Sequence, residues 1–171
     1  MNYTILKTMG NFKKFCKQIK QAPNRGVEEN AECSAIKFDD DDGFVASLAE
    51  NYANWCKVDY FEIIENDLIL IEMKDLQSKI LKDFKRKPTQ EELSGIFKNM
   101  SKKFKHSITL MAEIKPDLIP ITNYLVWKND TETNLIDKYL PKEFKDRPYQ
   151  ICRTNEICAK LSTFDTRLCQ E

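Results

Sequence analysis

Two acidic residues and a lysine lie at the ends of two neighbouring apolar runs, and their types suit phosphate chemistry. Asp59 stands near the start of the first run, residues 58–64. Glu72 stands at the end of the second run, residues 68–73, and Lys74 directly follows that run. Carboxylate oxygens bind Mg²⁺, and a lysine beside them can orient water or offset the charge on a phosphate. These residue types therefore predict hydrolysis of a phosphodiester bond.

The two apolar runs predict a β-hairpin that would gather the three side chains. With a turn centred on Glu65 and Asn66, antiparallel pairing places Asp59 opposite Glu72. Residues directly opposite each other point to the same face of a sheet, and Lys74, two residues further on, points there too. Two opposed carboxylates repel each other unless a cation lies between them, which favours a divalent metal. The alternative is a set of salt bridges between these acids and lysines at the end of the strand.

The sequence at this hairpin resembles the PD-(D/E)XK nuclease superfamily. Residues 58–74, VDYFEIIENDLILIEMK, carry the resemblance. Asp59 stands where the family has its first aspartate, and Glu72-Met73-Lys74 matches the (D/E)XK tripeptide. The resemblance covers about residues 42–128 and implies a restriction-endonuclease-like αβββαβ core that binds Mg²⁺ or Mn²⁺ and cuts DNA, less often RNA. It also implies that Asp59 and Glu72 are metal ligands and that Lys74 is catalytic.

The same resemblance implies further site residues. Many members carry another acid on the helix before the hairpin; Glu50, on a helix predicted over residues 43–55, is the first candidate and Glu32 the second. Gln77, just after the tripeptide, is expected to contact the substrate. The helices that follow would present a group of lysines to a phosphate backbone: Lys98, Lys102 and Lys105. A homodimer is also expected, because one site cuts one strand.

The elements that must position the hairpin follow from periodicity and turn signals. Helices are predicted over residues 11–21, 43–55, 75–86, from Thr89 to about 113, and 132–146. Besides the hairpin, strands are predicted over residues 34–38 and 123–128 and within 150–161. Thr89 with Glu92 forms a capping box. This order predicts a single α/β domain with a mixed central sheet flanked by helices, a core at about 34–128 and a C-terminal extension, 129–171.

Charge is balanced over the whole chain but separated along it. The 171 residues include 27 Lys and Arg, 27 Asp and Glu, and one His. The charged residues of 28–50 are acidic except for Lys37, and those of 74–105 are mostly basic. The acidic segment could imitate nucleic acid or dock on a basic protein partner. An alternative function is therefore a non-catalytic binding protein: an immunity protein, an inhibitor or a subunit that grips nucleic acid, on a nuclease-like or another α/β scaffold.

The six cysteines are predicted to be free and mostly buried thiols. No pair has CxxC spacing, and a single histidine excludes a zinc site with two histidines. The N-terminus lacks the long apolar stretch of a secretory signal, and no window reaches the length of a membrane span. We therefore expect a cytoplasmic protein without disulfides.

Overall fold

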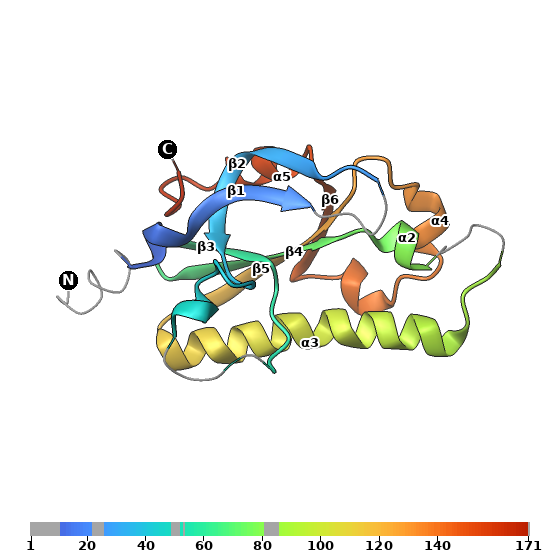
Figure 1. Ribbon diagram of the computed structural model, residues 1–171, viewed down its shortest axis with the longest axis horizontal. Coiled ribbons are helices and arrows are strands. Elements are labelled where there is room, and N and C mark those ends of the chain that lie inside the picture. Colours follow the sequence, from blue (N-terminus) through green and yellow to red (C-terminus); the bar gives the residue numbers. More distant parts are fainter. Residues whose placement is uncertain (1–10, 22–25, 49–51, 53, 81–85, 171) are drawn as a thin grey trace.

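A six-stranded mixed sheet forms the centre of the protein. The computed structural model describes residues 11–21, 26–48, 52, 54–80 and 86–170. The strands lie side by side in chain order (Figure 1): β1 Cys16–Gln21, β2 Glu29–Lys37, β3 Tyr60–Ile64, β4 Asp67–Lys74, β5 Ile119–Trp127 and β6 Tyr149–Arg153. Neighbours from β1 to β4 pair antiparallel, whereas β4, β5 and β6 pair parallel. The strands predicted at 34–38, 123–128 and within 150–161 are confirmed as β2, β5 and β6.

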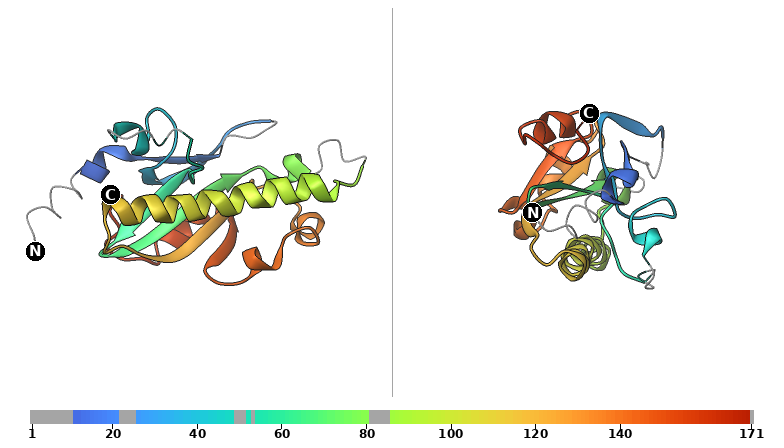
Figure 2. Two further views of the ribbon diagram at one scale, coloured as in Figure 1. Left: turned by 90° about the horizontal axis from the view of Figure 1, so that it is seen from below. Right: turned by 90° about the vertical axis from the view of Figure 1, so that its left-hand side faces the viewer.

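Helices cover both faces of the sheet, which confirms the predicted α/β class. The described helices are α2 Leu76–Ile80, α3 Gln90–Ile114, α4 Thr133–Asp137 and α5 Ile157–Leu161, with short 3-10 turns η1 Lys13–Phe15, η2 Val45–Ser47 and η3 Lys142–Lys145. The long helix α3 runs along one face, and α5 lies on the opposite face (Figure 2). In chain order α3 connects β4 to the parallel strand β5. Within the described ranges no helix is long and apolar enough to cross a membrane.

The β3–β4 hairpin has the predicted register. Ile64 pairs with Asp67 around a two-residue turn, and Tyr60 pairs with Ile71. Glu65 in the turn has a φ of 54°, in the left-handed region that a tight hairpin turn requires. The apolar residues of one hairpin face belong to the same buried cluster as the inner face of α3: Phe61, Ile63, Leu68 and Leu70. The hairpin is therefore fixed by its turn and by packing against α3.

Helix α3 begins at the predicted capping box. The Thr89 side chain accepts a hydrogen bond from the backbone N–H of Glu92, and the Glu92 carboxylate accepts one from the backbone N–H of Thr89. The helix ends at Ile114, one residue beyond the predicted end. Its buried side chains recur at helical spacing, as the sequence pattern predicted: Leu93, Phe97, Met100, Phe104 and Met111.

Three predicted helices differ from the structure. The helix predicted over residues 11–21 is helical only in its first half, and its second half is wrong, because β1 pairs with β2 from Cys16 to Gln21. Backbone pairing to the longer strand outweighs a weak helical pattern. The helix predicted over 132–146 is divided into α4 and η3, and Pro141 precedes η3. Proline has no backbone N–H to continue a helix, which accounts for the division.

The helix predicted over residues 43–55 is also not formed as expected. In its described part the regular structure is the 3-10 turn η2, and the N–H of Leu48 bonds to the carbonyl of Val45 in that turn. Glu50 lies outside the described residues. The helix predicted over 75–86 is present as α2, and residues 81–85 also lie outside the described part.

The cysteine prediction is wrong for four of the six residues. Cys16 is bonded to Cys169, and Cys33 to Cys158, with sequence separations of 153 and 125 residues. Cys56 and Cys152 are free. Bridges between residues so far apart leave no local spacing signal. The pairing depends on the folded chain, which carries the C-terminal segment back across the sheet to β1 and β2.

Candidate functional site

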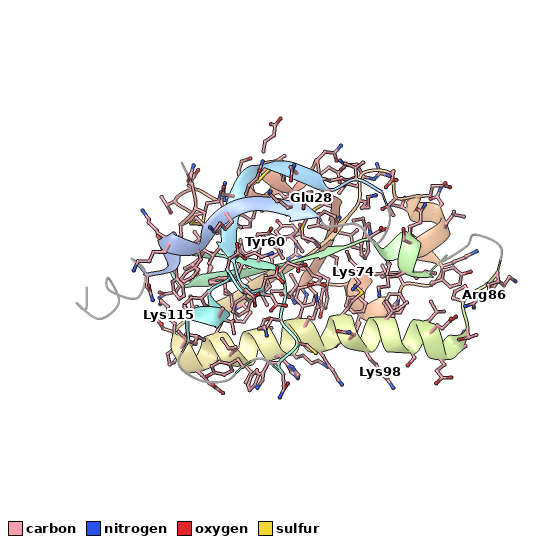
Figure 3. All side chains as sticks on the ribbon, viewed as in Figure 1. Glu28, Tyr60, Lys74, Arg86, Lys98 and Lys115 are labelled. Atoms are coloured by element: carbon pink, nitrogen blue, oxygen red, sulfur yellow. A yellow bond between two sulfur atoms is a disulfide. The ribbon has the colours of Figure 1, made fainter. Side chains whose placement is uncertain are left out.

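The three predicted site residues lie together at the open end of the β3–β4 hairpin. Glu72 and Lys74 are separated by one residue on β4, so both point to the face that packs against α3. Asp59 directly precedes β3, and its Oδ2 accepts a hydrogen bond of 2.8 Å from the backbone N–H of Met73. This bond holds the Asp59 carboxylate against the end of β4. Figure 3 shows Lys74 at this end of the strand.

Glu72 is the most enclosed charged group of the site. Its side chain is 0% exposed, and its Oε1 accepts a 2.7 Å hydrogen bond from Nζ of Lys103 on α3. Its second oxygen, Oε2, is buried and has no hydrogen-bond partner. A buried carboxylate oxygen without a partner is costly, because water no longer solvates it. The arrangement therefore leaves one oxygen of Glu72 without a protein partner.

Lys103 is a site residue that the sequence prediction missed. It lies three residues after Met100 and four before Ser107, and both of these are buried. A charged residue at this spacing lies on the edge of the buried stripe of a helix. That spacing was the signal available in the sequence, but the predicted group of lysines did not include Lys103.

The charges of the site shift one another's pKa values. Burial, followed by the charge of Asp59, raises the pKa of Glu72 to about 8, although Lys103 and Lys74 oppose this. Burial lowers the pKa of Lys74, and Lys103 and Lys79 add to that effect. Burial alone would also lower the pKa of Lys103, but its attraction to Glu72 and Asp59 outweighs this and raises it. Burial and Asp59 thus favour the protonated form of Glu72, whereas the positive charge of Lys103 favours the ionised form.

A second charged pair lies beside this group. Nζ of Lys57 is 3.4 Å from Oδ1 of Asp39, and the Lys57 side chain is buried. Lys57 also donates to the backbone carbonyls of Tyr52 and Trp55. Asp39 contributes to the raised pKa of Lys103. The loop after β2 therefore adds an acidic side chain to the surroundings of the site.

The carboxylates present are suited to a divalent metal of the Mg²⁺ type. Asp59 and Glu72 offer hard oxygen donors, and Oε2 of Glu72 lacks a protein partner. In the part of the chain that the structure describes, no group of three or more His, Cys, Asp or Glu is placed to hold a metal ion. Mg²⁺ keeps several waters and often takes only one or two carboxylates from the protein, so a pair is compatible with it.

The predicted lysines of α3 lie away from Glu72. Lys98, Lys102 and Lys105 are exposed, and Lys98 projects from the side of α3 that faces away from the sheet (Figure 3). Lys98 and Lys105 line a pocket on the flank of α3 opposite Lys103. Oε1 of Gln77 accepts a 2.6 Å hydrogen bond from the backbone N–H of Glu132, which ties α2 to the start of α4. The contact of these four residues with nucleic acid stays a prediction.

Part of the acidic segment, residues 28–50, makes contacts within the chain. Glu28 pairs with Lys20 at 3.6 Å, and Asp40 with Lys37 at 2.7 Å. The Glu29 carboxylate accepts from the backbone N–H of Asn129. These contacts offset part of the negative charge that a basic partner would meet. Docking of a protein partner on this segment stays a prediction.

Comparisons of the chain with protein-family models, with curated proteins and with solved structures find no match. They therefore assign no family. Any function has to be argued from the residues and their geometry.

Proposed function

We propose that the chain is a metal-dependent nuclease that hydrolyses phosphodiester bonds of DNA. The observation that carries this proposal is the convergence of Asp59, Glu72 and Lys74 at one end of the hairpin, with Oε2 of Glu72 buried and without a partner. A purely structural set of salt bridges would be expected to use that oxygen. The unsatisfied oxygen instead favours a site that takes a cation.

The order of the elements supports the same proposal. Strands β2, β3 and β4 form an antiparallel meander, and α3 then leads to the parallel strand β5. This order agrees with the βββαβ part of the core that the resemblance to PD-(D/E)XK nucleases implies. Among the described residues before β2, Asn11 and Phe12 are α-helical and are followed by η1 and β1.

Each residue has a distinct part in the proposed chemistry. Asp59 and Glu72 would hold Mg²⁺ or Mn²⁺, which when bound supplies a water of lowered pKa and offsets charge on the phosphate. Lys103 keeps Oε1 of Glu72 in place and leaves Oε2 free for the ligand. Burial lowers the pKa of Lys74, and its Nζ would orient the attacking water or offset the charge that develops on the phosphate.

A plasmid assay tests this function. Purified full-length protein should convert supercoiled plasmid to nicked or linear DNA with Mg²⁺ or Mn²⁺ and not with EDTA. Lys74→Met should slow cleavage about a hundredfold or more, because the group that orients the water and offsets charge on the phosphate is lost. Lys17→Ala, which removes an exposed lysine of β1, is the matched control and should cut like the wild type. No cleavage by the wild type, or undiminished cleavage by Lys74→Met, would contradict the proposal.

A non-catalytic binding protein is the second candidate function. It is favoured by the ion pair between Lys103 and Glu72, since an ammonium group already neutralises the carboxylate that a metal would need. Thermal unfolding with and without Mg²⁺ or Mn²⁺ separates the two candidates. A metal that binds only the folded state stabilises it by about 1.4 kcal/mol for each tenfold excess over its Kd. The nuclease proposal expects a rise in Tm that is absent in Glu72→Gln, and the binding-protein proposal expects no rise.

The cellular location and the oligomeric state of the proposed nuclease stay predictions. The sequence suggested a cytoplasmic homodimer. Disulfides, however, persist mainly in oxidising compartments, so Cys16–Cys169 and Cys33–Cys158 favour a location outside the reducing cytoplasm. Alkylation of free thiols in freshly lysed cells, followed by mass spectrometry, tests this: four blocked cysteines besides Cys56 and Cys152 would support the cytoplasmic prediction.

A further inference from the structure

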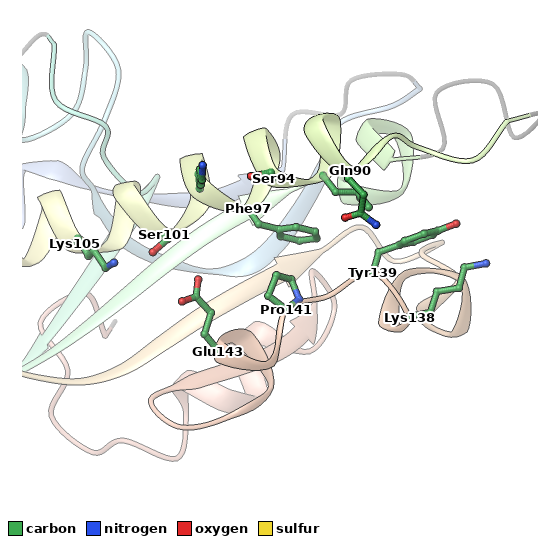
Figure 4. Close-up of a pocket in the computed structure, with 11 residues that line it drawn as sticks. Gln90, Ser94, Phe97, Ser101, Lys105, Lys138, Tyr139, Pro141 and Glu143 are labelled. Carbon is green, nitrogen blue, oxygen red and sulfur yellow. The ribbon is translucent and has the colours of Figure 1, made fainter.

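A pocket of about 610 Å³ lies on the flank of α3 that faces away from Lys103. One wall is α3, and the other is the segment from Lys138 to Glu143 after α4 (Figure 4). Its volume is within the range of about 300–1,000 Å³ typical of small-molecule sites. The proposed active site uses no residue of this pocket.

The pocket carries an excess of positive charge. Lys98, Lys105 and Lys138 line it, and Glu143 is the only acid among its described lining residues. Neither Lys98 nor Lys105 forms an ion pair within the described part of the chain, and both are exposed. Two unpaired ammonium groups about two helical turns apart on one helix can contact two phosphates of one extended strand.

Aromatic and apolar groups form the floor of the same pocket. Phe97, Tyr139 and Pro141 lie together below α3, with Ser94 above them (Figure 4). The Phe97 ring is 5.9 Å from that of Phe144 and is 6% exposed, so its position is fixed. Tyr139 is half-buried, and Nζ of Lys138 lies 4.9 Å from its ring centre. A flat aromatic surface beside cations suits a base with its phosphate.

We propose that this pocket binds one nucleotide of a single-stranded nucleic acid, with the base against Tyr139 and Phe97 and the flanking phosphates at Lys98 and Lys105. A duplex would not use the aromatic surface, because its bases are paired and stacked on each other. The inference rests on the nucleic-acid substrate of the proposed function, and it does not rest on cleavage.

The helix connects this pocket to the proposed active site. With about 3.6 residues per turn, Lys102 lies between Lys103 on one flank and Lys98 on the other, on the outer face of α3. Lys102 is exposed. A single strand that crosses the outer face of α3 would therefore meet a positive charge on each flank and between them. The pocket thus indicates that the substrate is single-stranded, a property on which the site around Glu72 gives no information.

Binding of a fluorescein-labelled oligothymidine in EDTA, followed by fluorescence anisotropy, tests the inference without cleavage. Lys98→Ala/Lys105→Ala should weaken binding at least about tenfold and reduce the log–log salt slope by about 0.7 for each lysine. The matched control, Lys17→Ala/Lys160→Ala, removes two exposed lysines on β1 and α5 and should bind like the wild type.

Two further variants separate stacking from charge. Tyr139→Leu keeps an apolar side chain and removes the aromatic face, and it should weaken binding about five- to a hundredfold. Glu143→Gln removes the only acid among the described lining residues and should strengthen binding. Thermal unfolding of each variant shows whether it is folded, and the exposed lysine variants keep the test decisive if Tyr139→Leu is unstable.

The outcomes distinguish this inference from the nuclease proposal. No oligothymidine binding by the wild type, equal losses in the control, or tighter binding of duplex than of single strand would overturn the inference. Pocket-dependent binding without cleavage would support it while removing the nuclease function. Cleavage of DNA, together with unchanged oligothymidine binding by the pocket variants, would support the nuclease function and overturn the inference about the pocket.

Discussion

Glu72 is the residue on which the candidate site depends most. Its pKa is raised from 4.5 to about 8, first by burial and then by Asp59. The charged groups that face it are Asp59, Lys74 and Lys103. In the folded state Glu72 therefore binds its proton more tightly than in the unfolded chain.

This difference predicts how stability depends on pH. Because the folded-state pKa is the higher one, the contribution of Glu72 to the free energy of unfolding is complete below pH 4.5 and decreases as pH rises toward about 8. Between these values wild type should lose at least about 1 kcal/mol relative to Glu72→Gln. Urea unfolding across this pH range measures the difference. The control is Glu91→Gln at an exposed position, and parallel curves for wild type and Glu72→Gln would contradict the raised pKa.

At the residue scale the sequence predicted the acids and Lys74 but missed Lys103. The hairpin pattern is local, so pairing across a two-residue turn determines which side chains oppose each other. The contact between Lys103 and Glu72 joins residues 31 positions apart. It depends on how α3 is set against the sheet, which periodicity alone does not define.

At the scale of elements, α3 shows what a local signal can predict. Its start is set by the Thr89 capping box, and Arg86 adds two hydrogen bonds to the Glu92 carboxylate. These contacts lower the pKa of Glu92 to about 2, with Arg86 first and Thr89 next. The helices expected over residues 11–21 and 132–146 lacked such a cap. The structure replaces most of the first with η1 and β1 and divides the second.

Removing the cap should destabilise the protein measurably. Thr89→Ala should lower the free energy of unfolding by about 1 kcal/mol, because the N–H of Glu92 loses its acceptor. Thr109→Ala makes the same chemical change at an exposed position in the middle of α3 and should be neutral or slightly stabilising. Urea unfolding of both variants provides the test. Equal losses would show that helix propensity, and not the cap, determines the effect.

At the scale of the whole molecule, the C-terminal segment is secured to the sheet in several ways. Cys158 and Cys169 are bonded to β2 and to the start of β1. Glu62 on β3 is fully buried and accepts hydrogen bonds from Arg167 and from the backbone N–H groups of Leu168 and Cys169. Burial raises the pKa of Glu62, although the backbone N–H of Ile63, Arg167 and the backbone N–H of Cys169 oppose it. The sequence predicted the α/β class but not this long-range closure, since neither bridge has a local signature.

Loss of the bridges should reduce global stability. Reduction, or Cys16→Ala/Cys169→Ala, should cost about 2–5 kcal/mol, because the unfolded chain regains the freedom that a long closed loop removes. Chemical unfolding with and without a phosphine reductant measures this. Cys152→Ala removes a buried free thiol and serves as the control, which should still respond to the reductant. An unchanged midpoint for the wild type after complete reduction would contradict a stabilising role.

The bridge between Cys16 and Cys169 also has a mechanical consequence. The strands follow chain order, so β1 and β6 are the two outer strands of the sheet, yet the Cα atoms of Cys16 and Cys169 are only 5.6 Å apart. If the oxidised molecule is pulled by handles attached before Cys16 and after Cys169, the force passes through one covalent bond and the strands between them are not stretched. Because Cys33–Cys158 closes a second loop inside the first, a single-molecule trace would release the whole enclosed length only after both bonds are cut.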